Sequence, residues 1–281
     1  MMKHEFYYTS RDSVTKIHAI EWIPDGEAKG ILQICHGMVE YIDRYDDFAK
    51  FMCGHGYYVV GHDHLGHGKS IQTEADLGYF DERKGNQYVI GDIYRLQEMT
   101  KKKYPDAPYF MLGHSMGSFL LRQYLTMYAG GLSGAVIMGT GYQGALTLSA
   151  GRIVCRIIAA FKGWKYRSTF VDNLSFGGFN KKFEPGETSK EWITSDKKKR
   201  DEYVQDPLCS YTFTLGAYYQ MFTGMKVLVQ KESMERIPKT LPVLFTAGAD
   251  DPVGAFGKNV TRVYEKYKNA GIKDVSIHLY E

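Results

Sequence analysis

The chain has 281 residues, of which 44% are hydrophobic and 24% charged, a composition typical of a globular protein with one large domain and room for an insertion. Its 35 basic and 32 acidic side chains give a formal net charge of +3, too even a balance for a nucleic-acid-binding protein. The four cysteines are far apart in the sequence, so we expect reduced thiols in a cytoplasmic protein rather than a disulfide framework.

Short apolar runs alternate with segments of helical periodicity along the chain. The runs typical of buried strands are 30–37, 57–63, 108–114, 134–140, 241–248 and 274–280. The segments with helical spacing are 41–52, 87–103, 116–128 and 258–269. Strands that alternate with helices pair in parallel, so we expect an α/β fold with a mostly parallel, doubly wound sheet covered by helices on both faces.

One long interval interrupts this alternation. Residues 142–236 are rich in aromatic residues, lysine and glycine and contain no clear buried strand. Long insertions in compact folds are often functional, so we expect a cap over the carboxyl edge of the sheet rather than an ordinary helical excursion. The chain then divides into a first core part (1–141), the cap (142–236) and a second core part (237–281).

Gly113-His114-Ser115-Met116-Gly117 stands where a predicted strand runs into a predicted helix. A serine in such a tight turn is lifted above the sheet edge, where its hydroxyl can act as a nucleophile. Side chains at positions 113 and 117 would collide at the bend, which explains the two glycines. The Met116 N–H, at the start of the helix, can stabilise a developing oxyanion.

A second oxyanion donor is expected from the loop that follows an earlier strand. His36-Gly37-Met38 comes directly after the strand at 30–35, and Gly37 permits a sharp turn that leaves the Met38 N–H free to face Ser115. A simple turn glycine is the alternative interpretation.

Four segments occur in an order and spacing that resemble the α/β-hydrolase superfamily: HGMVEYIDRYDDFAKFM, GHDHLGHGKS, LGHSMGS and LFTAGADDPVG. Within it the chain is most similar to the monoacylglycerol lipase and lysophospholipase branch, the serine aminopeptidase S33 type. The resemblance implies a Ser-Asp-His triad with Ser115 as nucleophile, oxyanion N–H groups at Met38 and Met116, and an acyl-enzyme intermediate. It implies an acyl ester or a lipid with one acyl chain as substrate, and no cofactor or metal. Ser118 departs from the pattern, because many members have a further glycine there.

The triad acid follows the nucleophile in chain order, and two aspartates in LFTAGADDPVG compete for the role. Alignment with the family on the glycine and the Asp-Pro-Val run favours Asp251, with Asp250 as the alternative. An acidic turn that merely caps the helix at 258–269 is the structural alternative.

The triad base is harder to assign. His278, the only histidine after Asp251, lies within the predicted last strand, where Val275, Ile277 and Leu279 alternate on the opposite face. The family carries its base in the loop after this strand, so we expect the base just beyond Glu281 in a longer chain, with His278 as the fallback. His36 belongs to the oxyanion turn, and His114 should point away from the serine hydroxyl.

Two rival functions remain open. The histidines of HDHLGH, His62, His64 and His67, resemble the zinc motif of metallo-β-lactamase-type hydrolases, although Gly66 replaces the aspartate of that motif. The resemblance to α/β hydrolases instead implies a structural loop from Asp63 to Ser70, and we prefer that interpretation. A chain without its base could also be a non-catalytic protein that only binds acyl ligands. No nucleotide signature is present.

The segment AGRIVCRIIAAFKGW in the cap has one apolar helical face with Ile153, Ile157 and Phe161. This face either covers a core, or it lines an acyl tunnel or touches a membrane. Contact with an anionic membrane surface would suit the flanking basic residues Arg152, Arg156, Lys162 and Lys165. Acyl length, head group and oligomeric state are not encoded in any motif.

Overall fold

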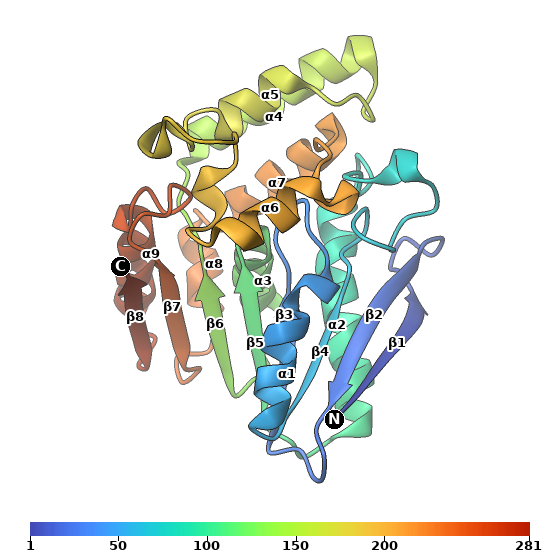
Figure 1. The fold of residues 1–281 in the computed structure, drawn as a ribbon. Helices are drawn as coiled ribbons and strands as arrows, with labels where there is room; N and C mark the ends of the chain where they lie inside the picture. The colour runs from blue at the N-terminus through green and yellow to red at the C-terminus, as the bar shows by residue number, and fades with distance from the viewer.

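The computed structural model describes all residues, 1–281, and contains one mixed sheet of eight strands in the order β1-β2-β4-β3-β5-β6-β7-β8 (Figure 1). The parallel strands are β3 (Gly30–Cys35), β4 (Tyr57–His62), β5 (Tyr109–His114), β6 (Gly134–Met138), β7 (Val243–Gly248) and β8 (Val275–Tyr280). The expected α/β-hydrolase architecture, a mostly parallel and doubly wound sheet, is confirmed.

An N-terminal hairpin extends one edge of the sheet, and the sequence analysis did not predict it. β2 (Lys16–Ile23) pairs antiparallel with β4, and β1 (Met2–Thr9) pairs antiparallel with β2. Asp92, in the helix Gly85–Lys103, connects that helix to the residues that follow β1. Its carboxylate accepts hydrogen bonds from the Ser10 hydroxyl (2.7 Å) and the Arg11 N–H (2.6 Å).

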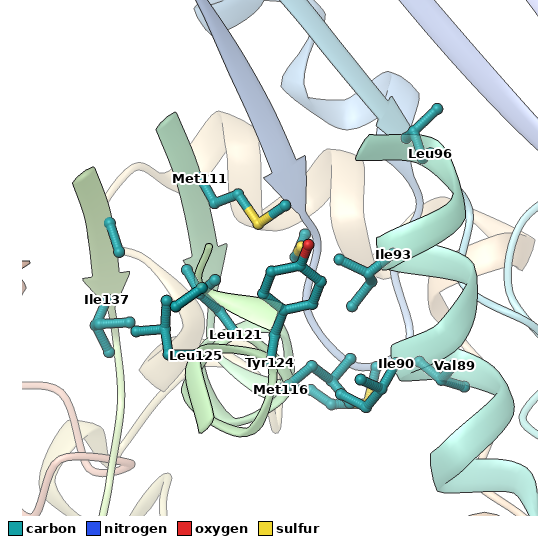
Figure 2. Close-up of a cluster of buried hydrophobic side chains, with 14 of the residues drawn as sticks. Val89, Ile90, Ile93, Leu96, Met111, Met116, Leu121, Tyr124, Leu125 and Ile137 are labelled. Carbon is teal, nitrogen blue, oxygen red and sulfur yellow. The ribbon is translucent and has the colours of Figure 1, made fainter. Parts of the chain in front are cut away.

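Helices cover both faces of the sheet. α1 (Asp46–Gly54) packs on one face, and α2 (Gly85–Lys103), α3 (Met116–Tyr128) and α9 (Lys258–Asn269) pack on the other. Figure 2 shows how Ile93 of α2, Tyr124 of α3 and Met111 of β5 meet in the larger buried cluster. This packing fixes the turn between β5 and α3, because both of its flanking elements are buried.

The interval between β6 and β7 contains helices joined by loops, and no strand. Its helices are α4 (Ala145–Lys162), α5 (Thr169–Phe176), α6 (Lys197–Gln205), α7 (Leu215–Val227) and α8 (Lys231–Glu235), with short 3₁₀ turns at Lys181–Phe183, Glu191–Ile193 and Pro207–Cys209. α4 and α5 form the outermost layer, beyond the carboxyl ends of the strands (Figure 1). α7 packs against α4 and also against α2 and α3, and α8 packs against α3, so the last part of the interval rests on core helices.

None of these helices has the length and apolar composition that a bilayer span requires. All four cysteines are buried and carry free thiols.

Candidate active site

Ser115 occupies the turn that joins β5 to α3. Its φ of 50° lies in the left-handed region, where a residue with a β-carbon is strained. The turn is held from both sides: the Ser115 N–H donates to the Met138 carbonyl (2.9 Å), and the Ser118 N–H and hydroxyl donate to the Ser115 carbonyl (2.9 and 2.6 Å). The Ser115 hydroxyl itself has no hydrogen-bond partner, so its oxygen is available to a substrate.

The two glycines of the turn lie against backbone atoms. A β-carbon on Gly117 would overlap the Cys35 carbonyl at the end of β3, and one on Gly113 would overlap the Gly117 carbonyl. Backbone groups of buried strands and helices cannot move aside, so neither position accepts a side chain. The structure therefore places Gly113 and Gly117 where the sequence analysis needed residues without a β-carbon.

The turn after β3 approaches Ser115 from the neighbouring strand. A β-carbon on Gly37 would lie 3.2 Å from the Ser115 β-carbon, which shows how closely the two segments meet. The Met38 N–H makes no hydrogen bond, and Met116 is the first residue of α3, so its N–H has no acceptor within the helix. The two segments that meet at Ser115 thus each carry an unpaired backbone donor.

The two candidate acids after β7 face different surroundings. Asp250 is 68% exposed at its side chain and forms an ion pair with Lys182 of the cap. Asp251 is half-buried: its Oδ1 accepts the Val253 N–H (2.8 Å), and its Oδ2 lies 3.5 Å from the position that a β-carbon on Gly139 would occupy. Burial raises the pKa of Asp251, while the Val253 hydrogen bond and the nearby His114 act to lower it. Neither carboxylate caps α9, whose N-cap is Gly257.

A charged network beneath Ser115 was not predicted. The His114 Nδ1 lies 3.1 Å from Glu40 Oε1 and 2.8 Å from the Tyr45 hydroxyl, and that hydroxyl donates to the same Glu40 oxygen (2.9 Å). Burial alone would lower the pKa of His114, but the hydrogen bond and charge of Glu40, together with Asp251, raise it. The His114 Nδ1 therefore faces Glu40 and Tyr45, and His114 makes no hydrogen bond with the serine hydroxyl.

His278 is exposed on β8, with its ring against Tyr280 (4.3 Å between centroids). The register sets His114, Met138, Thr246 and His278 in one row across four adjacent strands. Three steps of about 4.8 Å separate the β-carbons of His278 and His114 by roughly 14 Å, too far for His278 to reach Ser115. No histidine of residues 1–281 makes a hydrogen bond to the Ser115 hydroxyl.

The histidines of the HDHLGH segment form a buried cluster with His36. The His62 Nε2 lies 3.2 Å from the His64 Nδ1, the His64 Nε2 lies 3.1 Å from the His36 carbonyl, and His67 Nδ1 lies 3.2 Å from the Leu65 carbonyl. Burial lowers the pKa of His62 and of His67 to about 3. Because these nitrogens face one another and backbone carbonyls, they do not converge on a point where an ion could bind, and no group of three or more ligating side chains does so elsewhere.

The profile of the family described as "Serine aminopeptidase, S33" matches residues 26–281. Mouse monoglyceride lipase is 27% identical over 236 residues, which cover 82% of this chain and 68% of the relative. The structure of a thermostable carboxyl esterase from Bacillus coagulans, in complex with glycerol, is 28% identical with a TM-score of 0.91 and covers 100% of this chain and 90% of that one. A monoglyceride lipase from Saccharomyces cerevisiae, 20% identical with a TM-score of 0.76 over 100% of this chain and 86% of that one, shares the fold.

Proposed function

This chain belongs to the serine aminopeptidase S33 family of α/β hydrolases, and from that premise we propose that it is a serine hydrolase that cleaves carboxylic esters through Ser115. The observation that carries the proposal is the unpaired Ser115 hydroxyl, held at positive φ where two segments with free N–H groups meet. A strained serine with a free hydroxyl in such a turn is typical of a nucleophile.

In the proposed reaction, the Ser115 Oγ attacks the ester carbonyl carbon while its proton passes to an imidazole. The Met38 and Met116 N–H groups bind the resulting oxyanion, the alcohol leaves with the proton, and water then hydrolyses the acyl-enzyme. Asp251 orients the imidazole, because it is the less exposed of the two aspartates and its Oδ2 is turned toward Gly139. The imidazole is proposed to follow Glu281 in the sequence, since no histidine of residues 1–281 reaches Ser115.

We propose a substrate with a single acyl chain, of the monoacylglycerol or lysophospholipid type. The relatives named above support this choice, because they include monoglyceride lipases.

The outer face of the cap is proposed to rest on an anionic membrane surface while the substrate is extracted. α4 and α5 present apolar side chains to solvent that are all more than half exposed: Leu146, Ile153, Ile157, Phe161, Phe170 and Leu174. Arg156 and Lys162 beside them are exposed and form no ion pair, and α4 has no acidic residue. An apolar stripe with unpaired cations at its border is complementary to a surface of anionic lipid.

The cytoplasm is the proposed location, and the four free, buried thiols support it. A protein that binds acyl ligands without cleaving them is the second candidate, and the lack of an imidazole at Ser115 favours it. Hydrolysis of p-nitrophenyl butyrate and monooleoylglycerol by the full-length protein, including any residues encoded after Glu281, separates the two. We expect turnover of both esters that Ser115→Ala abolishes. Tight binding of monooleoylglycerol without turnover would establish the binding protein instead.

A further inference from the structure

Glu40 is a buried carboxylate, 8% exposed, that lies at the junction of three segments around Ser115. One of its oxygens, Oε1, accepts the Gly37 N–H of the turn after β3 and the Tyr45 hydroxyl of the 3₁₀ helix Ile42–Tyr45, and it lies 3.1 Å from His114 at the end of β5. Its other oxygen lies 3.7 Å from the Arg44 Nε. The carboxylate therefore contacts both segments that meet at the nucleophile.

We propose that Glu40 is a positioning residue that fixes the Met38 N–H relative to Ser115 by binding the oxyanion turn and the nucleophile turn through one carboxylate oxygen. The inference rests on the proposed function, since it concerns the alignment of the same nucleophile and the same donors.

The path of the chain between Gly37 and Glu40 shows how the carboxylate sets the Met38 N–H. Val39 has a φ of 54°, so the backbone turns back on itself and brings the Glu40 side chain onto the Gly37 N–H. Met38 lies inside this closed loop, directly after Gly37 and two residues before Glu40. If the carboxylate moves, the loop opens and the Met38 N–H changes direction.

The charge of Glu40 matters as well as its shape. Burial alone would raise the pKa of Glu40, but the hydrogen bond and positive charge of His114 outweigh burial and lower the pKa to about 2. Hydrogen bonds to an ionised acceptor are stronger and shorter than those to a neutral one. A neutral amide in this place would keep the size of the side chain but would weaken its hydrogen bonds with Gly37, Tyr45 and His114.

The chain offers a matched control in Glu21, a carboxylate of β2 that is 4% exposed and three strands away from β5 in the sheet. Glu21 also binds a tyrosine hydroxyl (Tyr58), a histidine (His4, 2.9 Å) and a cation (Lys103, 2.7 Å), but it lies away from Ser115. Glu21→Gln and Glu40→Gln therefore remove similar charges from similar networks, and only the second change touches the proposed oxyanion turn.

The test compares Glu40→Gln, Glu21→Gln and Ser115→Ala in the full-length protein. Loss of one oxyanion donor costs about 10²–10³ in kcat in serine hydrolases, so a misdirected donor should lower kcat by about 10–100-fold with KM within about twofold. Glu21→Gln should lower the free energy of unfolding to a similar degree and leave kcat unchanged. Tyr45→Phe, which removes one donor and keeps the carboxylate, should lower kcat by a smaller factor, and it replaces Glu40→Gln if that variant does not fold.

A spectroscopic measurement separates alignment from folding. The phosphonyl oxygen of a fluorophosphonate adduct on Ser115 binds the same N–H groups as the oxyanion, so Glu40→Gln should shift the ³¹P resonance of the adduct and Glu21→Gln should not. Equal kcat and an unchanged ³¹P resonance in Glu40→Gln would overturn the positioning role. Full activity in Ser115→Ala would instead overturn the proposed function, whatever the glutamate variants do.

Discussion

Asp250 and Asp251 are adjacent in sequence, yet one side chain faces the cap and solvent while the other is half-buried beside Gly139. Only a carboxylate that stays close to the site can orient an imidazole against Ser115. The backbone fixes this difference, because the Asp251 Oδ1 accepts the Val253 N–H and the Asp251 carbonyl accepts the Phe256 N–H.

Asp251→Asn in the full-length protein should lower kcat by about 10⁴-fold, the loss seen when a triad carboxylate is replaced by an amide. Asp250→Asn should change kcat by less than about threefold, because it removes an exposed ion pair with Lys182. Steady-state kinetics with p-nitrophenyl butyrate measure both. If Asp250→Asn is the more damaging change, the acid has been placed one residue too late.

The local part of the site could be predicted from the sequence, but the network of side chains that supports it could not. Gly-x-Ser-x-Gly between a strand and a helix, and Asp-Asp-Pro after a strand, are patterns of neighbouring residues, so their surroundings can be inferred from spacing alone. Glu40 and His114 are 74 residues apart, and only the pairing of β3 with β5 brings them together. An acidic residue three positions after the turn glycine, Glu40, was the one hint of this network in the sequence. Nothing in the neighbouring residues showed that its side chain folds back onto the Gly37 N–H.

At the scale of elements, the stability of the N-terminal hairpin depends on the protonation of one buried acid, Asp92. Burial raises the pKa of Asp92 to about 7, against the hydrogen bonds from Ser10 and Arg11 that act to lower it. In the unfolded chain an aspartate titrates near 3.9, so between about pH 4 and pH 7 the folded state holds a proton that the unfolded state has lost. Stability therefore falls as the pH rises through this window, by on the order of 4 kcal/mol from this group at most.

Asp92→Asn should remove this contribution, because the amide is neutral at every pH in the window and still accepts one hydrogen bond. The difference in unfolding free energy between pH 5 and pH 8, from urea titrations, should be smaller in the variant than in the wild type. Asp92→Asn should also be the more stable protein at pH 8. An identical pH dependence in both proteins would show that the Asp92 pKa is close to its usual value.

A second prediction concerns the exposed apolar face of the cap and its binding to membranes. Ile157 of α4 and Phe51 of α1 are equally exposed, at 57% and 59%, but lie on different sides of the molecule. Ile157→Asp should weaken sedimentation with phosphatidylglycerol vesicles at least tenfold, because it places a carboxylate against anionic lipid. It should lower turnover of long-chain monoacylglycerol in vesicles and leave p-nitrophenyl acetate turnover within about twofold.

Phe51→Asp serves as the matched control and should change neither vesicle binding nor turnover. Equal losses on both substrates, or wild-type protein that fails to bind the vesicles, would return this face of α4 to a purely structural role.

Elements with both faces buried were the most predictable. The strands β3 to β7 lie inside the sheet and appear in the sequence as continuous apolar runs, and α3 and α9 begin and end where predicted. β1 was missed because most of its residues are exposed, so its sequence lacks the apolar run of a buried strand. Pairing with β2, a tertiary contact, is what makes it a strand. β2 is buried but was missed as well, because the polar residues His18 and Glu21 interrupt its apolar run.

The division of the whole molecule into core and cap was inferred from composition, and the structure gives it more detail. α4 and α5 form an outer layer, whereas α7 and α8 pack on the core helices α2 and α3. Composition could not separate these parts, since both are helical. The boundaries at residues 142 and 236 remain a prediction, to be checked by limited proteolysis.

The position of the base is also a question about the whole molecule. The chain of residues 1–281 should react only slowly with a fluorophosphonate, because without a base serine hydrolases keep only about 10³–10⁴-fold acceleration over water. Adding any natural sequence encoded after Glu281 should accelerate labelling. His278→Ala should leave the rate unchanged in both versions, since its strand position is roughly 14 Å from that of His114. Rapid labelling of residues 1–281 that His278→Ala abolishes would identify His278 as the base.

Intact-mass analysis of the full-length protein after fluorophosphonate treatment shows whether Ser115 is a nucleophile. We predict one adduct per chain, located by peptide mapping to the residues around Ser115 and absent from Ser115→Ala. Ser118→Ala, which removes the neighbouring hydroxyl, should still be labelled. Hydrolysis of esters by Ser115→Ala at the wild-type rate, or an adduct on another residue, would contradict the account.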